Sequence, residues 1–148
     1  MWKMPLPFFK LALLVLLQSI SYWLYSFNIN FLEELLPIRF SGVGVYFGIV
    51  LIHFIAICLT ALVLCFPIAF FYQGFSLFVA FILGTTVLAP RIANLIERSS
   101  ANFHPFVVGL NLFDGLLYLV LLVVFSGYAR RFLLQNRATS DNNECSLT

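Results

Sequence analysis

The sequence predicts an all-α integral membrane protein with four transmembrane helices packed as a small bundle. The first observation is composition: 62% of the 148 residues are hydrophobic, 9% are charged, and the mean hydropathy is +1.02. Soluble domains are about 45–50% apolar and about 25% charged, and a water-soluble fold of this size cannot enclose so much apolar surface. The second observation is a series of apolar runs. A helix of about 20 residues crosses the roughly 30 Å hydrocarbon core of a bilayer.

The first predicted span covers residues 8–27. An aromatic cluster typical of a membrane–water boundary lies near its end and consists of Tyr22, Trp23 and Tyr25. Because no small-residue cleavage pattern follows, we expect this segment to stay in the protein as a helix and not to be removed as a secretory signal. A weak polar stripe on the same helix, expected to face the bundle interior, consists of Gln18, Ser21 and Tyr25.

The predicted second and third spans cover residues 43–71 and 75–96. The nearly uncharged stretch that holds them is too long for one crossing, so we place a break at the YQG of residues 72–74, shortly after Pro67. A third span that stopped at Pro90 would be short. We therefore expect that helix to continue through the proline with a kink.

The fourth predicted span covers residues 106–128, and the polar tail of residues 129–148 is predicted to be disordered because it has few large apolar groups. Basic residues in the short flanks predict the orientation. One side holds Lys3, Lys10, Arg130, Arg131 and Arg137, and the other holds Arg39, Arg98 and Arg91. This excess predicts that both termini are cytoplasmic. We expect the membrane to be the plasma membrane, or the inner membrane of a bacterium.

Asp114 is the main candidate for function because it lies about ten residues inside the fourth span, near the membrane midplane. A carboxylate there costs about 2.5–3.5 kcal/mol on insertion scales, so it must be paired, protonated or hydrated. Asn111, Asp114 and Tyr118 recur at i, i+3 and i+7 and share one face of the helix. We expect that face to point into the bundle.

His53 and Arg91 are the predicted partners of Asp114. His53 is about eleven residues into the second span, which enters the membrane from the same side as the fourth, so the two side chains lie at matching depth. Arg91 comes from the antiparallel third span. Because helical side chains lean toward the N-terminus of their own helix, Arg91 and Asp114 lean toward each other.

Three interpretations of this cluster remain open. It is a buried Arg91–Asp114 ion pair, with His53 and Asn111 as hydrogen-bond partners, that orders the helices. Alternatively, it is a proton or ion path through His53 and Asp114. In the third interpretation, the cluster binds a charged or polar span of a partner protein, so that the ion pair is complete only in the complex.

Small residues predict where helices approach closely. Gly44 and Gly48 form a GxxxG spacing on the second span, and Ala80 and Gly84 form the related pattern on the third. Such spacings let two backbones come together, either within one chain or between two copies of it.

Other classes of chemistry find little support in the sequence. The net charge of +2 and the scattered basic residues disfavour nucleic-acid binding. No metal or cofactor is expected, because the two histidines lie on different segments with no third ligand spaced for zinc. A membrane-embedded transferase or peptidase that uses Cys58 or Cys65 is a third, weaker possibility.

We therefore expect a non-enzymatic subunit, assembly factor or regulator of a membrane protein complex, whose partners are the lipid bilayer and either another membrane protein or further copies of itself. The alternative is a small oligomeric transporter or channel that uses Asp114, His53 and Arg91. The cytoplasmic half of the fourth span, LVLLVVF, is entirely apolar, which argues against a pore within one subunit.

Overall fold

The computed structural model describes residues 6–36, 43–98 and 105–145. The described chain is helical almost throughout and contains no strand, so the predicted all-α class is confirmed. Its elements are α1 (Leu6–Leu35), α2 (Val43–Tyr72), the 3-10 helix η1 (Gln73–Phe75), α3 (Ser76–Arg98) and α4 (Pro105–Cys145).

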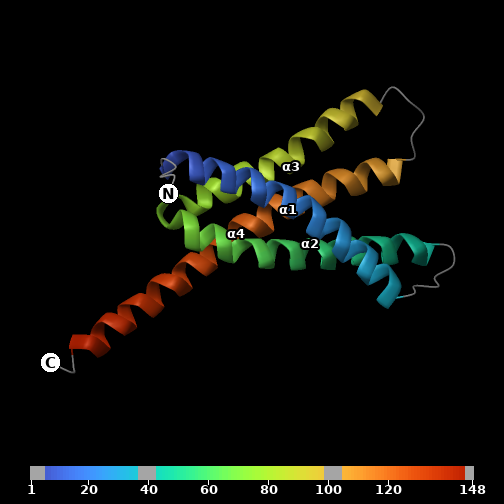
Figure 1. Cartoon of the computed structure of the whole chain (residues 1–148). Helices are drawn as coiled ribbons and strands as arrows, with labels where there is room; N and C mark the ends of the chain where they lie inside the picture. The colour runs from blue at the N-terminus through green and yellow to red at the C-terminus, as the bar shows by residue number, and fades with distance from the viewer. Residues whose placement is uncertain (1–5, 37–42, 99–104, 146–148) are drawn as a thin grey trace.

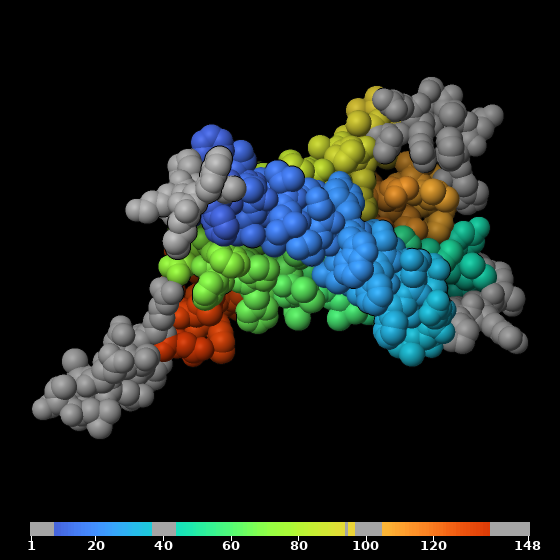
Figure 2. Space-filling model, viewed as in Figure 1, coloured from blue at the N-terminus to red at the C-terminus, as the bar shows by residue number. Residues whose placement is uncertain are grey.

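Three helical segments are long and apolar enough to cross a membrane, which supports a membrane protein. They are Phe8–Leu35, Gly44–Ala93 and Pro105–Asn136. The middle segment contains α2, η1 and α3, and its direction reverses at η1, so that α3 runs back alongside the bundle (Figure 1). Figure 2 shows α1 lying across the other helices as the outer layer on the side in view.

These residues form helices because a bilayer leaves a backbone no water with which to hydrogen-bond. A helix pairs its N–H and C=O groups internally and therefore suits an apolar segment in lipid. Pro67 lies inside α2 and Pro90 inside α3. Transmembrane helices tolerate such prolines because neighbouring helices and side chains satisfy the freed carbonyls.

The apolar core lies where α4 packs against α2 and α3, with α1 packed on α2. Its fully buried members include Ile57, Leu64, Ile68, Leu83 and Leu122. Ala80 is fully buried in the same cluster, one turn from Gly84. A Cβ built on Gly84 would lie 2.9 Å from the Cα of Leu119, so only a glycine permits this approach of α3 and α4. On α2, Gly48 is buried and Gly44 is half-buried.

α1 and α4 extend well beyond the ends that the sequence predicted. The prediction ended the first span at residue 27, but α1 continues to Leu35, and Leu32 packs in a second buried cluster with Ile52 and Ala56 of α2. The prediction also made residues 129–148 a disordered tail, whereas α4 continues to Cys145 and leaves the bundle (Figure 1). Extending an existing helix avoids the cost of nucleating a new one, so polar residues continue it.

Candidate functional site

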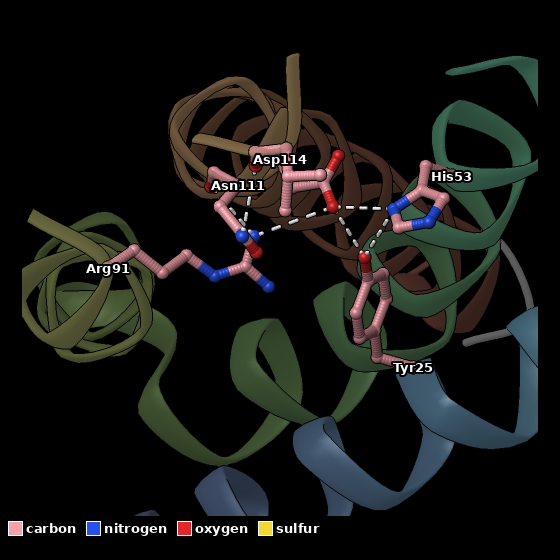
Figure 3. A network of polar contacts seen from close by, with 6 residues as sticks. Tyr25, His53, Arg91, Asn111 and Asp114 are labelled. Carbon is pink, nitrogen blue, oxygen red and sulfur yellow. Dashed lines mark hydrogen bonds and ion pairs between the residues drawn. The ribbon is translucent and has the colours of Figure 1, made fainter. Parts of the chain in front are cut away.

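Each of the four α-helices contributes one side chain to a polar cluster centred on Asp114 (Figure 3). From α1, the Tyr25 hydroxyl donates a hydrogen bond to Asp114 Oδ2 at 2.6 Å. From α2, His53 Nδ1 lies 2.6 Å from the same oxygen. From α3, Arg91 Nη1 lies 3.6 Å from it and forms an ion pair. We call Tyr25, His53, Arg91 and Asp114 the four-helix node.

The hydrogens of the node follow from its geometry when Asp114 is ionised. Tyr25 has one hydroxyl hydrogen, and Asp114 Oδ2 takes it. His53 Nδ1 lies 2.6 Å from that oxygen and 3.0 Å from the Tyr25 oxygen. When Asp114 is ionised, an unprotonated Nδ1 would be a second acceptor at such distances and would be repelled, so Nδ1 then carries a hydrogen and donates it. The Asp114 side chain is only 2% exposed, and these donors replace the water that burial removes from its carboxylate.

Arg91 is a partly exposed member of the node. Its side chain is 18% exposed, and its Nη1 donates to the backbone carbonyl of Asn111 at 3.1 Å. The guanidinium carbon lies 5.6 Å from the centre of the Tyr25 ring, within the range of a cation–π contact. Gly115 makes room for the arginine, since a Cβ there would lie 3.0 Å from Arg91 Cδ.

The second carboxylate oxygen of Asp114 differs from the first. Oδ1 is buried and has no hydrogen-bond partner among the described residues. A cavity of about 10 Å³ lies beside Asp114, with walls that include Ser21 and Tyr118. That volume is close to the minimum that holds the centre of one water molecule. Asp114 Oδ2 therefore contacts three side chains, whereas Oδ1 is available to a further hydrogen-bond donor.

Two residues that the sequence grouped with Asp114 have different roles. Tyr118 is buried but bonds to Ser21, with 2.7 Å between the two hydroxyl oxygens. Asn111 was expected to face the interior and bond to Asp114, but its side chain is exposed and donates to the Val107 carbonyl of its own helix at 3.1 Å. Asn111 lies one turn before Asp114, toward the start of α4, and its exposed amide bonds to a carbonyl of its own helix instead of to another helix.

The sequence did not show how many of the hydrogen bonds between helices involve α1. Thr86 of α3 donates to the Gln18 side chain at 2.9 Å, and Asn28 donates to Thr60 of α2 at 3.0 Å. The residues of this α1 seam, each bonded to another helix, are Gln18, Ser21, Tyr25 and Asn28. Their spacing of three or four residues was a usable signal. The sequence extended the stripe only to Tyr25 and also placed that residue in a boundary cluster.

Among the described residues, the node brings together a carboxylate, an imidazole, a phenol and a guanidinium. The hydrogen bonds of His53 go to Tyr25 and Asp114. Cys65 donates to the Leu62 carbonyl and lies in a separate cluster with Ala69. No thiol is therefore activated by the imidazole in the described chain. Within residues 6–36, 43–98 and 105–145, no three His, Cys, Asp or Glu side chains are grouped to hold a metal ion.

Comparison of the chain with protein-family models, with curated protein sequences and with solved structures finds no match.

Proposed function

We propose that this protein is a non-enzymatic subunit, assembly factor or regulator of a membrane protein complex. The observation that supports this best is the four-helix node, in which α1, α2 and α3 each supply one side chain to Asp114 Oδ2 of α4. A carboxylate on one helix whose partners come from the three other helices acts as a fixed junction. Such a junction suits a scaffold that presents its outer surface to another protein.

The exposed face of α1 supports a partner within the membrane. Trp23, Phe27 and Phe31 follow one another at intervals of four residues and are 66%, 51% and 50% exposed. Their rings stack, with centroids 5.5 and 6.2 Å apart. A pre-ordered row of aromatic rings offers a large contact area at a low cost in side-chain entropy. We call these three residues the aromatic row.

The proposal includes four membrane crossings with both termini in the cytoplasm of a plasma membrane or bacterial inner membrane. The reversal at η1 supports this count, because it divides the apolar segment Gly44–Ala93 into two helices that run in opposite directions (Figure 1). Arg130 and Arg131 follow the apolar part of α4, as the positive-inside rule expects of a cytoplasmic flank.

Co-purification in a mild detergent tests the proposal. We expect a stoichiometric partner protein to be retained by the unmodified chain and lost when Phe27 in the aromatic row is changed to Ala. The matched control is Phe78→Ala on α3, which removes a ring that is 62% exposed outside the row. A clean homo-oligomer with no second protein, in both chain and control, would contradict the subunit role.

Transport is the second candidate, and the unpartnered Asp114 Oδ1 favours it. A carboxylate oxygen beside a small cavity, with Tyr118 and Ser21 in its wall, is able to accept a proton. Proton flux into liposomes that contain the purified chain separates the two functions. Flux that disappears in Asp114→Asn would establish transport, and an absence of flux would leave the scaffold role as the better account.

A further inference from the structure

Two grooves flank α4 at the end of the bundle where η1 lies. One, of about 520 Å³, lies between the start of α3 and α4, with Leu77 and Val124 in its wall. The other, of about 410 Å³, lies between the end of α2 and α4, with Phe70 and Leu133 in its wall. Arg130 lines both grooves. Each groove is therefore lined by apolar side chains and by a guanidinium group.

The charge in these grooves is not balanced by the protein. Arg130 is half-buried and Arg131, which lines the larger groove, is exposed. Within the described part of the chain, neither guanidinium has a carboxylate at ion-pair distance. The sequence itself has no Asp or Glu between residues 35 and 96 or between residues 115 and 140. A half-buried arginine without a counter-ion favours an anionic ligand.

The depth of the arginines indicates where such a ligand would lie. Residues 106–125 of α4 form an apolar helix about 30 Å long, which matches the hydrocarbon core. Arg130 follows five residues later, about 7.5 Å along the axis and thus at the level of the lipid headgroups. Leu77 and Val124 lie on the membrane side of it. The smaller groove adds the polar side chains Gln73 and Asn136 near the same level.

We propose that these grooves bind an anionic phospholipid. Arg130 and Arg131 hold its phosphate through hydrogen bonds from the guanidinium groups, and the apolar walls hold the first part of an acyl chain. A free phosphate would use only the arginines, and an apolar partner helix would leave their charge unbalanced. The phospholipid is the one occupant that matches both the charge and the apolar surface of the grooves.

Native mass spectrometry of the full chain in mild detergent tests this site. The probes are phosphatidylglycerol and phosphatidylcholine with identical acyl chains, added at equal concentrations. We expect phosphatidylglycerol to be retained preferentially. The double variant Arg130→Gln/Arg131→Gln should reduce its affinity roughly 25-fold, since each basic residue near the surface contributes about a five-fold effect.

Two further variants make the result specific. Arg131 is exposed, so Arg131→Gln alone should leave the fold intact. We expect it to reduce the affinity for phosphatidylglycerol roughly five-fold. Lys10→Gln removes an equally exposed charge from α1, outside both grooves, and should leave the affinity unchanged. Equal retention of the two lipids, an unchanged affinity in the double variant, or a dimer that excludes lipid would overturn the proposal.

Discussion

At the scale of single residues, the chain keeps a carboxylate inside an apolar helix by giving one of its oxygens several donors. The Tyr25 hydroxyl and His53 Nδ1 both lie 2.6 Å from Asp114 Oδ2, while the Arg91 ion pair is longer at 3.6 Å. Close hydrogen bonds thus provide much of the compensation for burial, and Arg91 adds charge from a partly exposed position.

The Tyr25 hydroxyl should contribute measurably to stability. Tyr25→Phe removes a donor to a buried charged acceptor, which we expect to lower the free energy of unfolding by about 1–2 kcal/mol. The apparent Tm in detergent should fall by several degrees. Tyr22→Phe is the matched control, because that ring is 47% exposed on the same helix. Equal Tm values for the two variants would show that the Tyr25 bond is energetically unimportant.

Part of this site could be predicted from the sequence. Depth and side-chain direction place His53 and Arg91 beside Asp114, because both quantities follow from helix geometry. The role of Tyr25 could not be derived in the same way, since it depends on the angle at which α1 crosses the bundle. The exposure of Asn111 depends on how the helices pack around this part of α4, which is likewise a tertiary feature.

At the scale of elements, the contact between α3 and α4 depends on glycine. A methyl group on Gly84 would lie 2.3 Å from Leu119 Cδ1 and 2.9 Å from its Cα. The backbone of α4 cannot move aside as a flexible side chain can, so the two helices would have to separate. The small-residue spacing of Ala80 and Gly84 indicated a helix contact in the sequence, but it could not identify α4 as the partner.

Substitution of this glycine should separate α3 from α4. Gly84→Ala is expected to lower stability by about 1–3 kcal/mol, the usual cost of overpacking, as measured by thermal unfolding in detergent. The control is Gly109→Ala on α4, where a new Cβ has nothing within 4 Å. That change should be neutral or should stabilise the helix by up to about 1 kcal/mol. A similar Tm for both variants would show that the close approach at Gly84 is unimportant.

The boundaries of elements were harder to predict than their existence. The apolar runs indicate helices because a bilayer permits few alternatives. Hydropathy does not fix the last turn of α1, which contains Glu33 and Glu34 but continues to Leu35 with Leu32 packed against α2. It also misses the continuation of α4 to Cys145, because helix propagation extends beyond the apolar segment.

At the scale of the whole molecule, the proposed four crossings place both termini on one side of the membrane. Epitope tags at the two ends, probed in intact and in permeabilised spheroplasts, test this directly. We expect both tags to be inaccessible until the membrane is permeabilised. A single tag that is accessible in intact spheroplasts would instead indicate an odd number of crossings and would contradict the proposed four.

All four α-helices contribute to the four-helix node, and one double-mutant cycle tests its structural role most directly. The measurement is the thermal unfolding of Asp114→Asn, Arg91→Gln and the double variant in detergent. Asp114→Asn alone leaves Arg91 without its counter-charge and should lower both Tm and abundance, while neutralising both residues should restore part of the loss. The coupling between the two sites should lie between about 0.5 and 3 kcal/mol. Unchanged Tm and abundance in Asp114→Asn alone would contradict the structural role of the four-helix node.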